Sequence, residues 1–323
     1  MKQWMAGSVA GICLLIGVQV QAATGFMVDP RAETLVEELA AEGLDAEQVR
    51  EWLSRGEFLE STRTNIAAPR ERTSTWADYR PIFVNDLSVE RGRAFMEEHA
   101  ETLARVEEEL GVDARIVTAI IGVETRYGRI TGNHPVMNAL GTTAFSDSAR
   151  SGYFLRELKA FFRLVDEEGV DPLTLTGSYA GAMGVPQFMP SSFLAYAIDF
   201  SNDGRRDIWN NPTDAIGSVA NYLAEHRWET GGPIAMRAHV EGGDFETIVD
   251  NSQRRPHMPL AESRNAGWSP VRPVDDDRMV STFRLEGDNG AEFWYGFQNF
   301  YVITRYNHSI SYAMAVYQLS REF

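Results

Sequence analysis

Glu124 carries the strongest chemical signal in this chain, because it is a lone carboxylate at the end of a mostly apolar run. The run covers residues 116–123, and the sequence Thr-Arg-Tyr-Gly follows Glu124 directly. A carboxyl group on an apolar surface loses hydration when it ionises, so burial raises its pKa. A carboxyl that keeps its proton near neutral pH can act as a general acid. We therefore predict that Glu124 is an acid catalyst.

A second segment, residues 177–192, combines small residues with hydrogen-bonding side chains. Glycine and alanine dominate its first half, which lets the backbone approach a ligand closely. Ser178 and Gln187 add a hydroxyl and an amide, which suit a sugar or an amide ligand. A packing loop ahead of a helix capped by Ser191 or Ser192 would explain the same residues, so the segment alone leaves both interpretations open.

A third segment has the spacing of a calcium-binding loop. Oxygen-bearing side chains stand at positions 1, 3 and 5 and a glycine stands at position 6, as in an EF-hand loop. These residues are Asp199, Ser201, Asp203 and Gly204. Position 12 carries Asn210 instead of a bidentate glutamate, so Asp214 would have to supply that ligand from further along. An Asx-rich turn without an ion is the alternative. A bound ion would be structural, because no other residue of the loop suits catalysis.

The elements that position Glu124 are predicted to be helices. An amphipathic helix is expected to begin at Ser88 and to stop at Gly111, and Asp113 can cap the next helix. That helix would carry Glu124 and end at Gly128, since glycine readily takes the left-handed conformation of a helix stop. Glu124 then lies near a helix C-terminus, where the macrodipole also disfavours a negative charge and adds to the predicted rise in pKa.

Helical patterns cover most of the remaining chain. Asp29 followed by Pro30 predicts a helix start, residues 151–168 show apolar side chains at helical spacing, and a last helix is expected from Ser309. Residues 231–292 differ, because apolar and polar residues alternate there. We predict an α+β fold that is mainly α. The predicted regions are a signal peptide (1–22), an N-terminal helical region (23–112), a catalytic core with the EF-hand-like loop (113–230), a small β-rich insertion (231–292) and a return to the core (293–323).

The first 22 residues have the pattern of a secretory signal. Lys2 precedes an apolar stretch at about residues 5–20, and Ala22 ends a sequence that fits cleavage. An uncleaved anchor is the alternative, although the stretch is short for a membrane span. Cys13, the only cysteine of the sequence, lies inside this segment, and Ile12 before it does not favour lipid attachment. A mature chain without disulfides fits a bacterial periplasm, so we expect a soluble periplasmic protein.

Composition and motifs argue against several classes of function. Acidic residues outnumber basic ones 46 to 30, which gives a net charge of −16. Nucleic-acid binding needs clustered Lys and Arg, so we expect no nucleic-acid partner. The sequence also lacks a His-Glu-x-x-His motif, a P-loop and a Gly-x-Ser-x-Gly motif. Zinc hydrolases, nucleotide enzymes and serine esterases therefore have no support.

Four motifs, taken together, resemble the lytic murein transglycosylase B family. They follow one another in order, and the resemblance runs from about residue 28 to the C-terminus. The motifs are Gly122–Gly128, Gly177–Gly184 with Gln187–Ser192, the Asp199 loop with Asp214–Tyr222, and Arg305–Ser309 with Tyr312–Val316. The chain departs from the family pattern in one additional residue between Trp209 and Asp214, and in Val185-Pro186 where a tyrosine-glycine pair is expected.

The resemblance implies a lysozyme-like helical core with an additional helical domain and a small inserted β-rich domain. It implies cleavage of the β-1,4 bond between N-acetylmuramic acid and N-acetylglucosamine in peptidoglycan, with Glu124 as the single acid and base. The implied substrate-binding residues are Arg126, Ser178, Tyr179, Met183, Gln187, Tyr306, Asn307 and Tyr312. The implied calcium ligands are Asp199, Ser201, Asp203, the Arg205 carbonyl and Asp214. Catalysis needs no cofactor in this scheme, and calcium would be structural.

The carboxylates near the motifs favour a particular mechanism. No second Asp or Glu flanks the Glu124 or Gly177 motif in a way that invites the pairing found in most glycosidases. We hypothesise that Glu124 protonates the leaving oxygen, that the substrate's N-acetyl oxygen stabilises the sugar cation, and that the C6 hydroxyl closes a 1,6-anhydro end. A hydrolytic muramidase and a non-catalytic peptidoglycan-binding protein are the alternatives. The expected partners are glycan strands, with cell-wall synthesis or division machinery as further candidates, and we expect a monomer.

Overall fold

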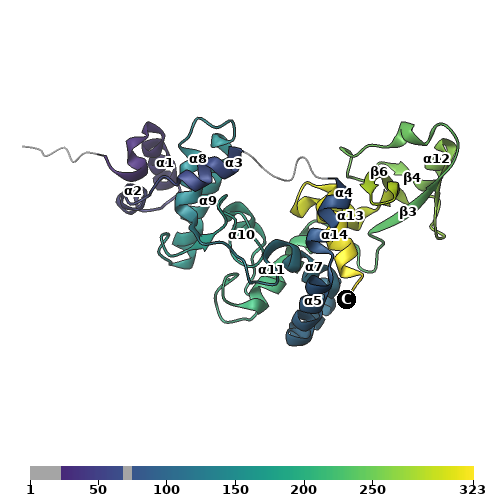
Figure 1. The fold of residues 1–323 in the computed structure, drawn as a ribbon. Helices are drawn as coiled ribbons and strands as arrows, with labels where there is room; N and C mark the ends of the chain where they lie inside the picture. Colours follow the sequence, from purple (N-terminus) through teal and green to yellow (C-terminus); the bar gives the residue numbers. More distant parts are fainter. Residues whose placement is uncertain (1–22, 68–74) are drawn as a thin grey trace, which may run out of the picture.

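Helices form most of the protein in the computed structural model, which describes residues 23–67 and 75–323 (Figure 1). The predicted signal segment, residues 1–22, lies outside the described residues. The α-helices are α1 (Pro30–Ala41), α2 (Ala46–Ser54), α3 (Glu60–Ala67), α4 (Trp76–Phe83), α5 (Asp86–Glu98), α6 (Ala100–Leu110), α7 (Ala114–Thr125), α8 (Val136–Ala144), α9 (Ser151–Glu168), α10 (Pro190–Tyr196), α11 (Pro212–Glu225), α12 (Leu260–Ser263), α13 (Gln298–Tyr306) and α14 (Ile310–Ser320). Short 3-10 helices cover Gly25–Val28, Phe245–Ile248 and Arg264–Ala266. None of the helices within the described ranges is both long and apolar enough to cross a membrane.

The helices pack in two groups that do not follow the order of the chain. In the first group α1 packs on α2, α3 packs on α8, and α8 packs on α9. In the second group α4 packs on α14, α5 on α7, and α6 on α11. Figure 1 shows the purple α1 and α2 on the same side of the molecule as the teal α8 and α9. Helices from both sides of the predicted 112/113 boundary therefore meet in each group. An amphipathic stripe predicts that a helix is buried but does not identify its partner.

A five-stranded antiparallel sheet forms the β-rich part of the molecule. Its strand order is β4-β6-β7-β3-β5. The strands are β3 (Ala235–Val240), β4 (Met258–Pro259), β5 (Trp268–Pro270), β6 (Met279–Gly287) and β7 (Gly290–Gly296). β7 runs past residue 292 and is followed by α13, a helix that the sequence reading did not predict before Ser309. A separate pair, β1 (His134–Pro135) and β2 (Thr176–Gly177), lies beside the second predicted motif.

Side-chain caps confirm several predicted helix starts. The Asp29 carboxylate accepts the Arg31 N–H at the start of α1, and Asp113 caps α7 in the same way. Ser309 caps α14, and α9 covers the predicted residues 151–168. These caps are local bonds between neighbouring residues, which is why the sequence was sufficient to place them.

Two predicted helix starts are corrected by the structure. The helix expected at Ser88 begins at Asp86, because Asn85 accepts the Ser88 N–H as its cap. It is interrupted at His99, and the next helix, α6, ends at Leu110 with Gly111 as its C-cap. The helix expected to be capped by Ser191 or Ser192 begins at Pro190. There the buried Glu157 carboxylate accepts both the backbone N–H (3.0 Å) and the hydroxyl (2.8 Å) of Ser191, so a distant residue takes the place of a local cap.

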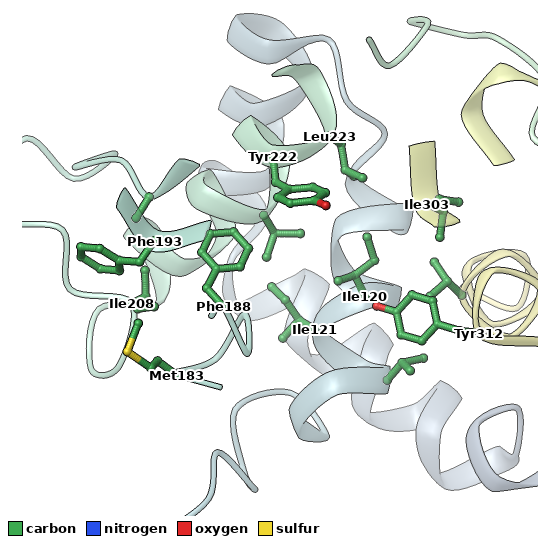
Figure 2. Close-up of a cluster of buried hydrophobic side chains, with 14 of the residues drawn as sticks. Ile120, Ile121, Met183, Phe188, Phe193, Ile208, Tyr222, Leu223, Ile303 and Tyr312 are labelled. Atoms are coloured by element: carbon green, nitrogen blue, oxygen red, sulfur yellow. The ribbon is translucent and has the colours of Figure 1, made fainter. Parts of the chain in front are cut away.

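The hydrophobic core surrounds α7, the helix that carries Glu124. Ile120 and Ile121 have no exposed surface, and Figure 2 shows them with Phe188 and Tyr222 on one side and Tyr312 on the other. Burying one such side chain stabilises the fold by about 1.5–3 kcal/mol. Because so many apolar neighbours surround α7, the position of its last turn is fixed by the whole core.

Candidate active site

Glu124 lies in the last turn of α7 and is half-buried, whereas most of the helix around it is buried. The hydroxyl of Tyr312, on α14, donates a hydrogen bond to Glu124 Oε1 at 2.7 Å. Tyr312 is 2% exposed and points from α14 towards α7 (Figure 2). A phenol that donates to a carboxylate favours its ionised form, which opposes the effects of burial and of the helix dipole. The raised pKa of Glu124 therefore stays a prediction.

The end of α7 differs from the predicted stop at Gly128. The helix ends at Thr125, and Arg126, Tyr127 and Gly128 all have left-handed backbones with φ of 53°, 62° and 78°. Two of these residues are not glycine, so tertiary contacts must stabilise the turn. The Tyr127 hydroxyl donates to the Ser88 carbonyl at 2.7 Å. This contact lies 39 residues apart in the chain, so local sequence could not predict it.

Gly122 explains how Tyr127 reaches its place. A Cβ built on Gly122 would lie 2.6 Å from the Tyr127 ring, so only glycine lets the ring pack against the helix. Arg126 turns away from Glu124 towards α4, where its guanidinium donates to the Ile82 carbonyl at 3.0 Å and lies over the Phe83 ring. The turn after Glu124 is thus held by α4 and α5.

Two phenols surround the Glu124 carboxylate. Burial raises the pKa of Tyr312 well above its ordinary value, and the negative charge of Glu124 adds to the rise. Burial followed by the Glu124 charge has the same effect on the pKa of Tyr306. Both hydroxyls therefore stay protonated and act as donors.

The Tyr306 hydroxyl donates to the Pro186 carbonyl at 2.7 Å rather than to Glu124. Val185 is held on both sides, since its carbonyl accepts the Thr125 hydroxyl at 3.2 Å and its N–H donates to the Ile208 carbonyl at 2.9 Å. These bonds use the backbone of Val185 and Pro186. The replacement of the family's tyrosine-glycine pair therefore leaves the attachment of this loop to α7 and α13 intact.

The Gly177 loop forms a compact turn beside β1. Ser178 Oγ accepts the Ala182 N–H at 3.1 Å, and the backbones of Gly177 and Phe188 bridge to that of Met183. A Cβ on Gly177 would lie 2.2 Å from the Ala182 carbonyl, so the turn requires glycine. The tight packing agrees with the interpretation as a packing loop, and the ligand-binding interpretation stays a prediction.

The other predicted binding residues differ in what they expose. Gln187 has a left-handed backbone and its amide nitrogen donates to the Thr131 and Gly184 carbonyls at 3.0 and 2.8 Å, so this donor is already used. Tyr179 is exposed at 37%, and Asn307 is half-buried directly after α13. Met183 has no exposed surface, so its side chain cannot touch a ligand in this structure. Met183 is a large side chain among small residues because it packs into the core.

Several residues that support the site were not predicted. Thr125 and Tyr127 lie in the Glu124 motif, and their hydroxyls could have been noticed as anchors. Tyr79, on α4, is 7% exposed and lies close enough to Tyr312 to contribute to its raised pKa. No sequence motif surrounds Tyr79. Its role follows from the packing of α4 on α14 alone.

The calcium-like loop gathers three carboxylates. Oxygens of Asp199, Asp203 and Asp214 all lie within 4.8 Å of one another. Asp214 has no exposed surface, and burial raises its pKa, with the negative charge of Asp199 adding to the rise. Backbone N–H groups of Ser201 and Asp207 donate to Asp214 at 2.8 and 3.1 Å, which fixes the carboxylate without neutralising it.

The donor set fits a calcium ion. Hard oxygen ligands are what calcium prefers, and carboxylates brought this close repel one another without a cation. Asn210, at position 12, bonds Asp207 instead of facing the cluster, as its departure from the EF-hand pattern predicts. The Asn211 amide donates to Ser201 Oγ at 3.0 Å, so a donor lies beside this predicted ligand. The Arg205 N–H donates to Asp203 at 3.0 Å, and its carbonyl remains a predicted ligand.

The calcium-like loop is attached directly to the loops around Glu124. Trp209 Nε1 donates to the Thr176 carbonyl at 3.2 Å on β2, and the Ile208 carbonyl holds Val185. An ion bound at Asp199 would therefore stiffen the segment that carries Ser178 and Gln187.

Comparison with known proteins identifies relatives over nearly the whole chain. A family model described as the Transglycosylase SLT domain matches residues 28–321. The membrane-bound lytic murein transglycosylase B of Escherichia coli (strain K12) is 39% identical over 310 residues, which cover 92% of this chain and 83% of that protein. The crystal structure of the soluble lytic transglycosylase SltB1 from Pseudomonas aeruginosa is 48% identical, covers 91% of this chain and 98% of that chain, and superposes with a TM-score of 0.86.

Two further solved structures contain bound groups. The Escherichia coli lytic transglycosylase Slt35 in complex with calcium is 38% identical, covers 93% of this chain and 95% of that chain, and has a TM-score of 0.84. SltB3 from Pseudomonas aeruginosa in complex with NAG-anhNAM-pentapeptide is 30% identical, covers 92% of this chain and 78% of that chain, and has a TM-score of 0.80. With the same helical architecture and the SLT domain across nearly all of its described residues, this chain belongs to the lytic murein transglycosylase B family and is a lysozyme-like peptidoglycan lytic transglycosylase.

Proposed function

We propose that Glu124 acts first as the acid and then as the base in cleaving the β-1,4 bond between N-acetylmuramic acid and N-acetylglucosamine. The protonated carboxyl gives its proton to the glycosidic oxygen as the bond from that oxygen to C1 of the muramic acid breaks. The N-acetyl oxygen of the same sugar stabilises the cation at C1. Glu124, now ionised, takes the proton of the C6 hydroxyl while the oxygen of that hydroxyl bonds to C1. The products are a 1,6-anhydro-muramic acid end and a free C4 hydroxyl, and no water is consumed.

The 2.7 Å hydrogen bond from Tyr312 to Glu124 is the observation that carries this proposal. A buried phenol holds the carboxyl in one orientation and stabilises its charge after the first proton transfer. The lack of a second Asp or Glu flanking the Glu124 and Gly177 motifs in the sequence supports a one-carboxylate scheme.

Mass spectrometry of the products tests the reaction type. Purified cell wall treated with the protein should release fragments that are lighter by one water than the corresponding hydrolytic fragments. A lysozyme-type muramidase would give the heavier fragments with a reducing end. A peptidoglycan-binding protein without activity would sediment with cell wall and release no soluble fragments. Either result would contradict the proposal.

The remaining site residues are assigned by position around Glu124. Tyr306, Asn307 and Tyr312 would surround the catalytic carboxyl, while Ser178, Tyr179 and Gln187 would line the groove along the Gly177 loop. Arg126 would act through its contact with α4. Met183 would hold the loop from inside. These roles can be separated by alanine substitutions that change KM without changing kcat.

Calcium would be held by Asp199, Ser201, Asp203, the Arg205 carbonyl and Asp214, and it would stabilise the fold without entering the reaction. The calcium complex of Slt35 supports this proposal for the present chain. The hydrogen bond from Trp209 to the Thr176 carbonyl connects the ion-binding loop to the groove, so loss of the ion would also loosen the groove.

The cellular setting follows from the substrate. We propose that the leading segment directs export, that the mature chain acts as a monomer in the periplasm, and that its substrate is glycan strand that carries peptides. The pentapeptide in the SltB3 complex supports a peptide-bearing substrate. Association with cell-wall synthesis or division machinery would be detected by crosslinking in cells.

A further inference from the structure

A cavity of about 800 Å³ lies between the end of α11, α13 and the β-rich part of the molecule. Its walls include Arg227 and Trp228 just beyond α11, Tyr301 and Arg305 on α13, and Arg255 from the loop before β4. The three arginines are far apart in the sequence and are all exposed. None of them belongs to the motifs around Glu124 except Arg305, which opens the last motif.

The cavity is positively charged in a chain whose net charge is −16. Within the described residues, Arg227, Arg255 and Arg305 have no carboxylate at salt-bridge distance, whereas the cavity's Glu229 is paired with Arg278 at 2.7 Å. Burial lowers the pKa of His226, which keeps that ring neutral at pH 7. Glu225 is then the one unpaired acid facing three guanidinium groups. Guanidinium groups bind carboxylates in a bidentate manner, so the cavity suits an anionic ligand.

The cavity is joined to the active site through α13. Arg305 directly precedes Tyr306, and its carbonyl accepts the Tyr222 hydroxyl at 2.5 Å. The rings of Tyr222 and Tyr306 are 4.8 Å apart, and the Glu124 charge contributes to the raised pKa of Tyr306. Arg305 and Tyr306 are consecutive residues of α13, so the cavity and the active site draw on the same helix.

We propose that this cavity, through Arg227, Arg255 and Arg305, binds the carboxylates of a peptide attached to the glycan strand. The proposal rests on the proposed function, because it assumes that a glycan strand lies at Glu124. Trp228 and Tyr301 supply apolar surface for the aliphatic parts of such a peptide. Arg255 would give the β-rich part of the molecule a direct contact with substrate.

The test removes charge from the cavity and compares two substrates. The double variant Arg227→Asn with Arg255→Gln removes two guanidinium groups, and asparagine tolerates the left-handed backbone at Arg227 (φ 69°). Arg305 is left unchanged because its substitution could also disturb the neighbouring active-site residue Tyr306. The substrates are purified glycan strands with peptides and the same strands after the peptides have been removed by an amidase. The control Arg156→Gln removes one charge from the exposed side of α9, where the guanidinium bonds only the Gly152 carbonyl among the described residues.

The double variant should raise KM for peptide-bearing strands about three- to tenfold, because two partly exposed ion pairs are lost. Activity on peptide-free strands should stay within about twofold, and Arg156→Gln should behave as wild type on both. The advantage of peptide-bearing strands in the wild type should also shrink as salt is added. An equal change on both substrates, or no change on either, would overturn the proposal.

Two further measurements separate this proposal from the proposed function. If wild-type protein forms no anhydro ends on peptide-free strands, the assigned reaction is wrong whatever the arginines do. If it forms them with no preference for peptides, only the cavity proposal fails. Thermal unfolding of the double variant checks its fold, and titration of the Glu124→Gln protein with a free stem peptide measures binding without turnover. A Kd that is unchanged by the two arginine substitutions would also overturn the cavity proposal.

Discussion

Two regions of this molecule use carboxylates in opposite ways. Glu124 stands by itself at the end of a buried helix and accepts a hydrogen bond from Tyr312. Asp199, Asp203 and Asp214 stand together, with oxygens within 4.8 Å of one another, and accept backbone N–H groups. An isolated carboxyl can exchange a proton with a bound substrate. Carboxylates gathered this closely repel one another and favour a cation between them.

The supports of the two regions differ as well. Glu124 is positioned by long-range contacts from α4, α5 and α14, whereas the Asp199 cluster is built largely from bonds within one loop and the start of α11. A substitution near Glu124 should therefore change activity without affecting cation binding. A substitution in the cluster should change stability first and activity second.

Replacing the isolated carboxyl should have the largest effect. Glu124→Gln keeps the shape of the side chain and an oxygen for Tyr312, but it cannot give up or take a proton. We expect kcat/KM on purified glycan strands to fall by about a hundredfold to ten-thousandfold. Glu97→Gln, an exposed glutamate on α5, makes the same charge change away from the site and should be neutral. A Glu124→Gln protein with full activity would show that another group is the acid.

Removing the hydrogen bond to the carboxyl should have a smaller effect. Tyr312→Phe keeps the ring in the core and deletes the donor to Glu124, a bond to a charged group worth about 1.5–3 kcal/mol. Activity should fall about tenfold to a hundredfold. Because the donor stabilises the ionised carboxylate, its loss favours the protonated form, and the alkaline limb of the pH–rate profile should move to higher pH. A shift to lower pH would contradict the assigned direction of this bond.

Calcium should act on stability through the gathered carboxylates. At a concentration 100 times its Kd, an ion that binds only the folded state stabilises it by about 2.7 kcal/mol. We expect calcium to raise the melting temperature of the wild type, a chelator to reverse the rise, and Asp214→Asn to abolish it. Asp288→Asn, in the exposed turn between β6 and β7, should respond to calcium as the wild type does. If Asp214→Asn still gains stability from calcium, the ion binds elsewhere.

Packing behind Glu124 can be tested with two helix glycines. Gly122→Ala would place a methyl group 2.6 Å from the Tyr127 ring, which should cost about 1–3 kcal/mol of stability and reduce activity by shifting the last turn of α7. Gly152→Ala, on α9, meets no atom closer than 3.9 Å and should be neutral or slightly stabilising. Thermal unfolding measures both. Equal effects of the two substitutions on thermal stability would mean that helix propensity, and not the Tyr127 contact, determines the change.

The sequence was most informative where the structure depends on neighbouring residues. Asp29 and Asp113 cap the helices that they were predicted to cap, and the spacing of Asp199 and Asp203 places their carboxylates together. Glu124 could be singled out because an acidic residue interrupts an apolar pattern. The family resemblance then supplied the fold class and the chemistry.

Long-range contacts limited the prediction elsewhere. The stop of α7 at Thr125 depends on Tyr127 reaching Ser88, and the burial of Met183 depends on the core around it. Neither contact leaves a periodic signal. The arginine-lined cavity could not be predicted for the same reason, because its residues come from three separate segments and meet only in the folded chain.

If one carboxyl completes the reaction without water, no oxygen from the solvent should enter the products. Wild-type protein would digest purified glycan strands in water enriched in the heavy oxygen isotope, and the muramic acid ends would be analysed by mass spectrometry. The one-carboxylate mechanism predicts anhydro ends that contain no label, because the oxygen bonded to C1 comes from the sugar's own C6 hydroxyl. Labelled reducing ends, heavier by one water, would contradict it.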